Sequence, residues 1–327
     1  MIKILISILN WNGANDTIQC LNSLLELEIL NNISIKIFVI DNASEAENYD
    51  LLKKSIKNPS WSMFRNEKNL GFAAGHNFSI KHALENNFDY IWLLNNDAVV
   101  HRNTLTALIS FMENEPKCGS CTPVVVRLSH AGIVDFCGAF HDWASLSVNH
   151  PSSFSEAENF CEKNANNLWL VGTALLLRVA AVRQVGFLNE KLFAYYEDND
   201  IGVRLINNGW TNRVVFDSVI EHACFEGVIT DRKPYYFYLM TRNSFLFYLK
   251  HTPPQYRKLI RLRLIDYSLA IAEKLYRLKL NEKADACLLG ITDGLSGKGG
   301  PPMLSRKVPL WIRSLRLIGR WWNHKQQ

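Results

Sequence analysis

The chain has 327 residues, of which 48% are hydrophobic and 20% charged, and this composition excludes a disordered or low-complexity protein. Its length allows one large domain or two smaller ones. The net charge of +5 is uneven, because residues 251–327 carry 15 basic and 5 acidic side chains and residues 1–250 carry 21 basic and 26 acidic. A basic C-terminal region favours an anionic partner such as membrane lipid, a phosphate-bearing substrate or nucleic acid. Because the sequence contains no recognisable nucleic-acid module, we expect no nucleic-acid partner.

The seven cysteines are an odd number scattered among apolar neighbours. Cys118 and Cys121 form a CxxC, but no second pair lies at zinc-finger spacing. We therefore expect reduced, packed thiols in a cytosolic protein. The apolar run within residues 1–10 is too short for a signal peptide, and no apolar stretch approaches the ~20 residues that span a bilayer. These features predict a protein that is neither exported nor integral to a membrane.

Strand and helix patterns alternate along the first 127 residues. Short apolar runs predict strands buried on both faces of a sheet, and helical spacing of apolar residues predicts the helices between them. Short, right-handed connections then predict an α/β fold with a doubly wound, mostly parallel sheet flanked by helices. The expected strands are residues 2–9, 35–40, 61–64, 90–94 and 118–127, and the expected helices run from 15 or 16 to 27, from 44 onward, from after 77 to 86 and from 103 to 115.

Two of these helices have recognisable start signals. Asn15 or Asp16 is expected to cap the first helix. Ser44 is expected to cap the second helix, with Glu47 three residues later completing a capping box.

Three of the expected strands end in polar side chains, at Asn10, Asp41 and Asp97. In an open α/β sheet, ligands bind beyond the carboxyl ends of the strands, where a carboxylate can hold a divalent cation and through it a phosphate. For each segment alone, a polar turn is the simpler interpretation. The sequence has no GxGxxG after the first strand and no GxxxxGKS/T, which argues against a nicotinamide oxidoreductase and a P-loop nucleotidase. The strand ends locate a site without naming its reaction.

Residues 132–167 are polar and predict a loop or β-hairpin region. Further on, Glu197, Asp198 and Asp200 open a helix that ends at Gly209. Acidic residues in a first turn favour the helix dipole, and Asp200 can pair with Arg204 four residues later. Asp198 points about 100° away from Glu197 and is left without a structural partner. It is therefore the best candidate for an exposed base.

The end of the chain leaves two alternatives open. His222 ends an apolar run, so a ligand role and a structural role are equally supported. An aromatic-rich helix is expected after residue 232, followed by basic helical patterns at residues 255–280 and 307–322. Residues 311–322 would suit a helix on an anionic membrane surface, and packing against the core or a second subunit is the equal alternative.

An ordered set of motifs resembles family 2 glycosyltransferases of the GT-A fold, in particular their bacterial rhamnosyltransferase-like branch. The resemblance implies a GT-A domain over residues 1–250, with a nucleotide-binding half at 1–127 and an acceptor and catalytic half at 128–250, followed by a basic helical region at 251–327. The motifs are Asn10-Trp-Asn-Gly13, Ile40-Asp-Asn-Ala-Ser44, Asn69-Leu-Gly-Phe-Ala-Ala-Gly-His-Asn77, Leu94-Asn-Asn-Asp97, Gly172-Thr-Ala174, Tyr196-Glu-Asp-Asn-Asp200 and, more weakly, Leu288-Leu-Gly-Ile-Thr-Asp-Gly-Leu-Ser-Gly297.

The resemblance implies an inverting, metal-dependent transfer of a sugar from a nucleotide-diphosphate donor to an acceptor hydroxyl. It implies that Asp97 binds Mg²⁺ or Mn²⁺ with help from His222, and that Asp198 is the general base. Two positions depart from the family pattern, since Asn95-Asn96-Asp97 keeps one carboxylate of the DxD motif and Asn189 replaces a usual Asp. The other implied residues are Asn10, Asn12, Asp41, Asn69, Gly71, Asn77 and Asn96 on the donor side, with Asp41 at the nucleoside, Glu197 beside the base, and Gly172, Thr173 and Asp200 on the acceptor side.

These features together predict a cytoplasmic glycosyltransferase, peripheral on the inner face of the cell membrane, that builds a cell-surface polysaccharide on a glycan or lipid-linked acceptor. Rhamnose is the candidate sugar, and a homo-oligomer stays open. A sugar-nucleotide nucleotidyltransferase is one competitor, but residues 10–15 contain no Lys or Arg for the basic loop that it would need. A non-catalytic nucleotide- or glycan-binding protein of the same fold is the other.

Overall fold

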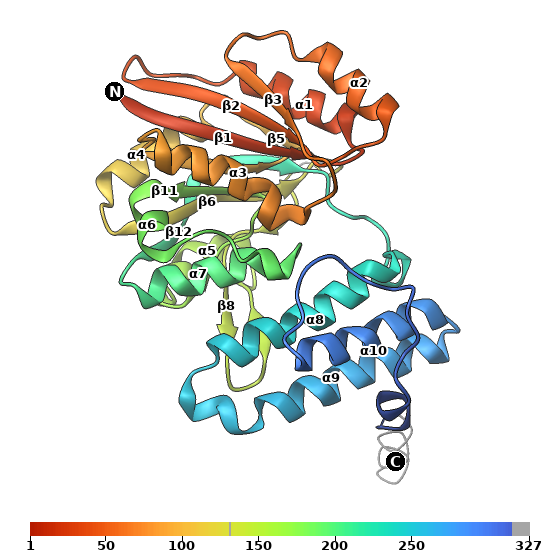
Figure 1. The fold of residues 1–327 in the computed structure, drawn as a ribbon. Coiled ribbons are helices and arrows are strands. Elements are labelled where there is room, and N and C mark those ends of the chain that lie inside the picture. The colour runs from red at the N-terminus through yellow and green to blue at the C-terminus, as the bar shows by residue number, and fades with distance from the viewer. Residues whose placement is uncertain (131, 316–327) are drawn as a thin grey trace. The chain divides into compact units, whose positions relative to one another are not determined.

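The computed structural model describes residues 1–130 and 132–315 (Figure 1). The chain divides into two compact units. Unit 1 comprises Met1–Asn189 and Glu197–Cys224, and unit 2 comprises Glu190–Tyr196 together with the chain from Phe225 onward. Residues 225–250, which the sequence analysis placed in the N-terminal domain, therefore belong to unit 2.

The first half of unit 1 is the predicted alternation of strands and helices. Its four strands form a parallel arrangement in the order β3-β2-β1-β4. The strands are β1 (Ile2–Asn10), β2 (Ile33–Asp41), β3 (Trp61–Arg65) and β4 (Tyr90–Asn95), and the helices are α1 (Ala14–Leu25), α2 (Ala46–Ser55), α3 (Gly71–Glu85) and α4 (Thr104–Asn114).

Beyond β4 the sheet becomes mixed. Within the described residues it has nine strands, in the order β3-β2-β1-β4-β11-β6-β12-β5 with β7 beside β6. Six strands run in one direction, whereas β5, β7 and β11 run in the other. The predicted α/β fold with a mostly parallel sheet is therefore confirmed. The remaining strands are β5 (Ala98–Val100), β6 (Cys118–Arg127), β7 (Val134–Phe136), β11 (Ala174–Arg178) and β12 (Thr211–His222).

Alternate residues of the central strands face two separate cores. Ile4, Ile6 and Ile8 of β1 pack with α1, α2 and α4, whereas Leu5 packs in the cluster that contains α3, α6 (Val179–Val185) and α7 (Glu197–Asn207). Burying each such side chain contributes about 2 kcal/mol. Because both faces are covered, β4 needs a continuous apolar run rather than an alternating one.

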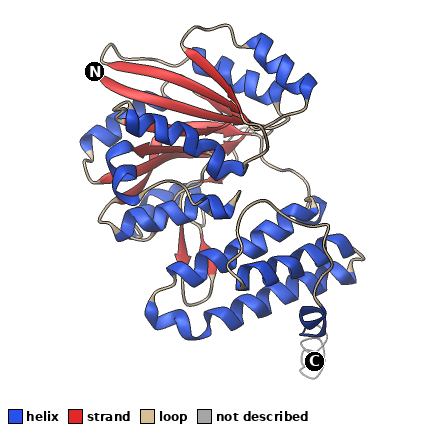
Figure 2. Cartoon of the chain, viewed as in Figure 1, coloured by secondary structure: helices blue, strands red, loops and turns tan. Residues whose placement is uncertain are grey.

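The polar region at 132–167 is more regular than the sequence predicted. The predicted hairpin is present as β8 and β9 (Figure 2), and β10, directly after this region, completes a three-stranded sheet in the order β10-β8-β9. The sequence analysis missed α5, because this helix buries only Ala157 and Cys161 and its apolar signal is weak. The elements are β8 (Ala139–Asp142), β9 (Ser147–Asn149), α5 (Phe154–Lys163) and β10 (Leu168–Trp169).

Both predicted helix caps are wrong. Gly13 occupies the N-cap of α1, and Asn15 and Asp16 lie inside the first turn. The N-cap of α2 is Glu45, without a side-chain cap. The hydroxyl of Ser44 instead accepts hydrogen bonds from the loop that follows β1. Tertiary contacts therefore override the local capping-box pattern.

Unit 2 contains three long helices, α8 (Pro234–His251), α9 (Arg257–Arg277) and α10 (Asn281–Leu295). Glycines allow α10 to approach α8 closely. A Cβ at Gly290 would lie 2.8 Å from the carbonyl oxygen of Tyr238, and one at Gly294 would lie 2.6 Å from the Cβ of Phe245. Larger residues at these two positions would force the helices apart.

A buried polar pair in α8 holds the segment Glu190–Tyr196 within unit 2. The Asn243 Nδ2 group donates to the carbonyls of Leu192, Ala194 and Tyr195, each at 2.8 Å. Arg242 donates to the Leu192 carbonyl at 2.9 Å. The φ angles of Phe193, Tyr195 and Tyr196 are 64°, 70° and 73°, in the left-handed region that costs energy for these residue types. The pair therefore stabilises a strained turn that leads directly into α7.

The seven cysteines are free thiols, and six of them are buried, as predicted. No helix in the described ranges is long and apolar enough to cross a membrane. The predicted surface helix at 311–322 lies largely outside the described residues.

Replacing Asn243 with Ala should lower the free energy of unfolding by about 3 kcal/mol, because buried carbonyls lose their donor. Denaturant unfolding would measure the loss, with Ser244→Ala as the control, since the Ser244 hydroxyl donates within its own helix to the Thr241 carbonyl. Equal effects of the two substitutions would contradict a role for Asn243 in holding the turn.

Candidate active site

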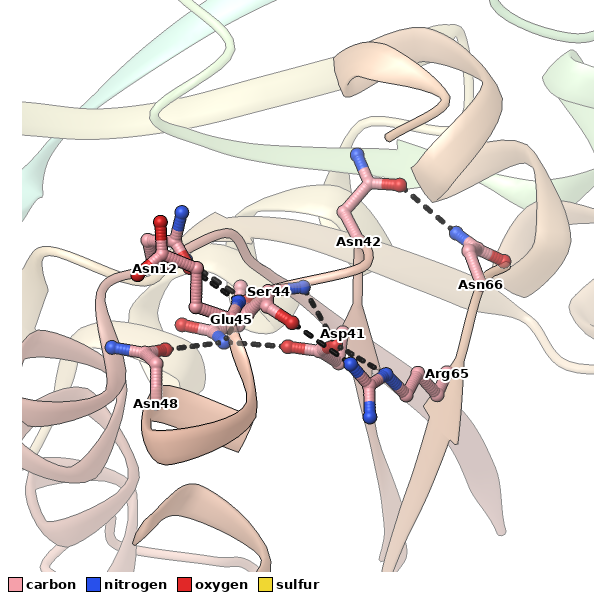
Figure 3. A network of polar contacts seen from close by, with 9 residues as sticks. Asn12, Asp41, Asn42, Ser44, Glu45, Asn48, Arg65 and Asn66 are labelled. Carbon is pink, nitrogen blue, oxygen red and sulfur yellow. Dashed lines mark hydrogen bonds and ion pairs between the residues drawn. The ribbon is translucent and has the colours of Figure 1, made fainter. Parts of the chain in front are cut away.

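A buried polar network joins the loops after β1 and β2 (Figure 3). Asn10 and Asp41 face each other at the ends of these parallel strands. Asp41 accepts hydrogen bonds from the Asn10 Nδ2 group at 2.9 Å and from the Ser44 N–H at 3.1 Å, and its Oδ2 lies 3.4 Å from the Arg65 Nε. This carboxylate therefore fixes both loops at one edge of the sheet.

Neither Asn10 nor Asp41 has exposed surface in this arrangement. A direct contact between Asp41 and a nucleoside, as the resemblance implies, would require the network to open. The structure favours a positioning role for both residues. The side chain that they bring to the surface is Asn12, which is exposed, has a φ of 56° and accepts a hydrogen bond from the Glu45 N–H at 2.8 Å.

The loop before α3 holds the next group of expected donor residues. Asn69 Oδ1 accepts hydrogen bonds from the Asn42 Nδ2 group at 2.9 Å and from the Gly71 N–H at 2.8 Å. The φ of Gly71 is 79°, which glycine adopts without strain. Asn77 is different, because its amide forms two 3.0 Å hydrogen bonds with the backbone of Leu188. These hydrogen bonds fix the Asn77 side chain to the Leu188 backbone.

Asp97 and His222 lie together although they are far apart in the sequence. The antiparallel pairing of β5 and β12 places His222 opposite Ala98, and the His222 Nε2 is 3.2 Å from the Asp97 Oδ1. That oxygen is buried and accepts no hydrogen bond within the described residues. A carboxylate oxygen that accepts no hydrogen bond, next to an imidazole nitrogen, can bind a divalent cation together with that nitrogen. Asp97 and His222 therefore suit the role of metal ligands.

A second carboxylate, Asp16, lies near Asp97 and was not predicted from the sequence as a site residue. Burial raises the pKa of Asp16, and the negative charge of Asp97 raises it further. The two residues approach because the Asn96 Nδ2 group donates to the Gly13 carbonyl at 3.2 Å and to the Thr17 hydroxyl at 3.0 Å. A bound cation would relieve this repulsion. The available sequence signal for Asp16 was its place in the first turn of the helix that follows the polar end of β1.

Asp198 is held more firmly than the sequence predicted. Its side chain is half-buried rather than exposed. Its Oδ2 accepts a hydrogen bond from the Gly172 N–H at 3.0 Å, and its Oδ1 accepts two from Asn199 at 2.7 and 2.6 Å. Burial raises the pKa of Asp198, and these hydrogen bonds partly oppose the rise.

The Gly172-Thr173 segment connects Asp198 to the end of β4. The Thr173 carbonyl accepts a hydrogen bond from the Asn95 N–H at 2.8 Å, and Asn95 is two residues before Asp97. Asp97 and Asp198 therefore belong to one hydrogen-bonded frame.

Glu197 and Asp200 flank the candidate base in different environments. Burial and then the charge of Asp198 raise the pKa of Glu197 well above its usual range, and its Oε2 is buried without a hydrogen bond among the described residues. Asp200 is buried and accepts from the Arg204 Nε at 2.7 Å, so the predicted pair is confirmed. The Asp200 carboxylate is thus buried and bonded within α7.

Residues 5–185, more than half of the chain, match the family described as glycosyl transferase family 2. The chain belongs to glycosyltransferase family 2. A 54-residue segment is 43% identical to the N-acetylglucosaminyl-diphospho-decaprenol L-rhamnosyltransferase of Mycobacterium tuberculosis. That match covers 16% of this chain and only 18% of the relative.

Solved glycosyltransferase structures share the fold of this family 2 chain. The mannosyltransferase PcManGT of Pyrobaculum calidifontis, in complex with GDP-Man and Mn²⁺, aligns with a TM-score of 0.57 at 13% identity over 90% of this chain and 87% of that one. TarS 1–349 of S. aureus with UDP-GlcNAc aligns with a TM-score of 0.59 at 15% identity over 99% and 88%. These similarities confirm the GT-A fold.

Replacing Glu197 with Gln should make the free energy of unfolding depend less on pH as the pH rises. Because the folded-state pKa is raised, the folded protein holds this proton more tightly than the unfolded chain. Wild-type stability therefore falls as pH rises from about 4.3, the ordinary glutamate value, through the folded pKa. Thermal unfolding across this range would measure the difference, with the exposed Glu47→Gln as the control. A stability difference that does not change with pH would contradict the assignment.

Proposed function

We propose that this family 2 glycosyltransferase catalyses an inverting, metal-dependent transfer of a sugar from a nucleotide-diphosphate donor to an acceptor hydroxyl. The observation that carries the proposal is the half-buried Asp198 carboxylate, held in the same hydrogen-bonded frame as Asp97. Burial raises the pKa of Asp198, and a raised pKa makes a carboxylate a stronger base.

In this proposal Asp198 accepts the proton of the acceptor hydroxyl on the face of the sugar opposite the leaving group. The hydrogen bonds from Gly172 and Asn199 orient its carboxylate. The raised pKa of Glu197 means that this neighbour keeps its proton to a higher pH than an ordinary glutamate. The negative charge beside the base is thereby reduced.

Asp97 and His222 would hold the divalent cation, and Asp16 would add a second negative charge nearby. A bound Mg²⁺ or Mn²⁺ would neutralise the charge that develops on the departing diphosphate. We favour Mn²⁺ because the site offers an imidazole nitrogen as well as oxygen. Asn12, Asn69 and Gly71 would line the donor side, with Asn10, Asp41 and Asn96 fixing their loops.

The substrates are proposed from chemistry and from the relatives. Among the similar structures, one contains GDP-Man and another UDP-GlcNAc, so we propose a nucleotide sugar as donor and test UDP sugars, GDP sugars and nucleotide-activated rhamnose first. The relative in M. tuberculosis is named for rhamnosyl transfer to a diphospho-decaprenol, which supports a lipid-linked or glycan acceptor in surface-polysaccharide synthesis. The basic C-terminal region would place the enzyme at an anionic membrane face.

Incubation with a panel of nucleotide sugars and Mn²⁺ should release nucleoside diphosphate in the wild type. Asp198→Asn should lower this rate about 10³-fold while leaving nucleotide binding intact, because only the base is removed. Because the pKa of Asp198 is raised, the wild-type rate should begin to fall during acidification at a pH above about 4, the ordinary pKa of aspartate. Asp50→Asn, on the exposed side of α2, is the control.

Near-normal turnover in Asp198→Asn would reject its role as the base. Release of pyrophosphate from a nucleoside triphosphate and a sugar phosphate would identify a nucleotidyltransferase instead. Nucleotide-sugar binding without any turnover would indicate a non-catalytic binding protein.

Asp97→Ala should weaken Mn²⁺ binding in the presence of UDP or GDP by about tenfold or more, because a direct ligand is lost. Asp16→Asn should weaken it less, since it removes only a neighbouring charge. Electron paramagnetic resonance of free Mn²⁺ would measure both, against Asp50→Asn. An unchanged Mn²⁺ titration in Asp97→Ala would contradict the metal assignment.

A further inference from the structure

We infer that Asp135, His222 and Cys224 form a second cation site, selective for a thiophilic ion such as Zn²⁺, and that an ion bound there competes with the cation that Asp97 and His222 would hold. We call the latter the donor-site cation. The competition rests on the proposed function, because it treats His222 as a ligand of that cation. The existence of the second site does not depend on the proposed function.

The fold brings these three residues together from two sides of one strand. β7, which contains Asp135, and β12, which ends at His222, both pair with β6. One potential ligand atom from each of Asp135, His222 and Cys224 lies within 4.8 Å of the other two. The Cys224 Sγ is 3.3 Å from the His222 Nδ1. Strand pairing therefore brings Asp135 to His222 and Cys224, which are two residues apart in the sequence.

The three ligand atoms differ in chemistry, and this set favours Zn²⁺ over Mg²⁺ or Mn²⁺. Sulfur, nitrogen and carboxylate oxygen bind tetrahedral Zn²⁺ at about 2.0 to 2.3 Å, which places ligand atoms roughly 3.3 to 3.8 Å apart. The spacing between the Cys224 Sγ and the His222 Nδ1 already fits that geometry. Asp135 is exposed and can complete the set, leaving a fourth position for water.

Two local features set the strength of this site. The Arg127 Nε lies 3.8 Å from the Asp135 Oδ1 and must yield to an incoming cation. Cys224 binds a metal ion as its thiolate, so its thiol proton must leave. Binding therefore releases the thiol proton of Cys224 to solvent as the sulfur–metal bond forms.

His222 cannot serve both cations while its ring is neutral. Its Nε2 faces the Asp97 Oδ1 at 3.2 Å and its Nδ1 faces the Cys224 Sγ at 3.3 Å. A neutral imidazole has one lone pair and one N–H. An ion on Nδ1 leaves the proton on Nε2, which then donates to Asp97. The donor-site cation thereby loses its imidazole ligand. The Asp97 carboxylate, its remaining ligand, now also accepts a hydrogen bond from the His222 Nε2–H group.

Titration of the full chain with Co²⁺ tests the site without any activity. Wild type should bind one Co²⁺ with a thiolate-to-cobalt charge-transfer absorbance that Zn²⁺ abolishes. Cys224→Ser should lose this absorbance, and the matched control Cys287→Ser should keep it, because Cys287 is buried in α10 of unit 2. Asp135→Asn should weaken the binding about tenfold. An absent band in wild type, or a band that persists in Cys224→Ser, would overturn the proposal.

The competition is tested on Mn²⁺-dependent release of nucleoside diphosphate. Zn²⁺ should inhibit the wild type, and excess Mn²⁺ should relieve the inhibition. Cys224→Ser should keep the Mn²⁺-dependent rate and need at least about tenfold more Zn²⁺ for half-inhibition, since its sulfur ligand is lost. Equal Zn²⁺ sensitivity in both would reject the competition. If no donor is turned over, the proposed function fails while the Co²⁺ spectrum still decides the site.

Discussion

The hydrogen bond between Asn10 and Asp41 is the constraint on which the proposed donor side depends. It joins the ends of two parallel strands in a fully buried setting, where an unpaired amide or carboxylate would be costly. The Asn10 Oδ1 also accepts from the Thr17 hydroxyl at 2.9 Å, and Thr17 in turn accepts from Asn96. One buried carboxylate thus orders three successive strand ends, including the turn that carries Asp97.

The proposed catalytic side depends on the reversed strand β11. Because β11 runs antiparallel to β4, its entering segment Gly172-Thr173 passes the end of β4, where Asn95 bonds to the Thr173 carbonyl. The neighbouring Gly172 N–H is then free to reach Asp198. A Cβ at Gly172 would lie 3.6 Å from the Cβ of Asp198, so the approach is close but not strained. The reversal therefore links the candidate base to the candidate metal ligand.

Sequence reasoning was most successful where one local cause dominated. The apolar runs predicted β4 and β6 closely, because burial on both faces leaves little choice of residue. The predicted cap at Ser44 was wrong, because its hydroxyl accepts a hydrogen bond from the Asn12 N–H rather than capping its own helix. The predicted exposure of Asp198 was wrong, because its partner Gly172 is 26 residues away in the chain. Sequence reasoning gave Asp16 only a capping role, since the charge that perturbs Asp16 comes from Asp97. Each failure involves a partner that is remote in the chain.

The sequence by itself determined the alternation of strands and helices, the strand ends at which polar residues gather, and membership of the family. These properties follow from hydrophobic periodicity and local motifs, which depend on near neighbours. Only the tertiary structure decided which polar residues are buried supports, as Asn77 and Asp41 are, and which pairs meet, as Asp97 and His222 do. Burial and pairing depend on strand order and direction, and these are set by the packing of the whole sheet.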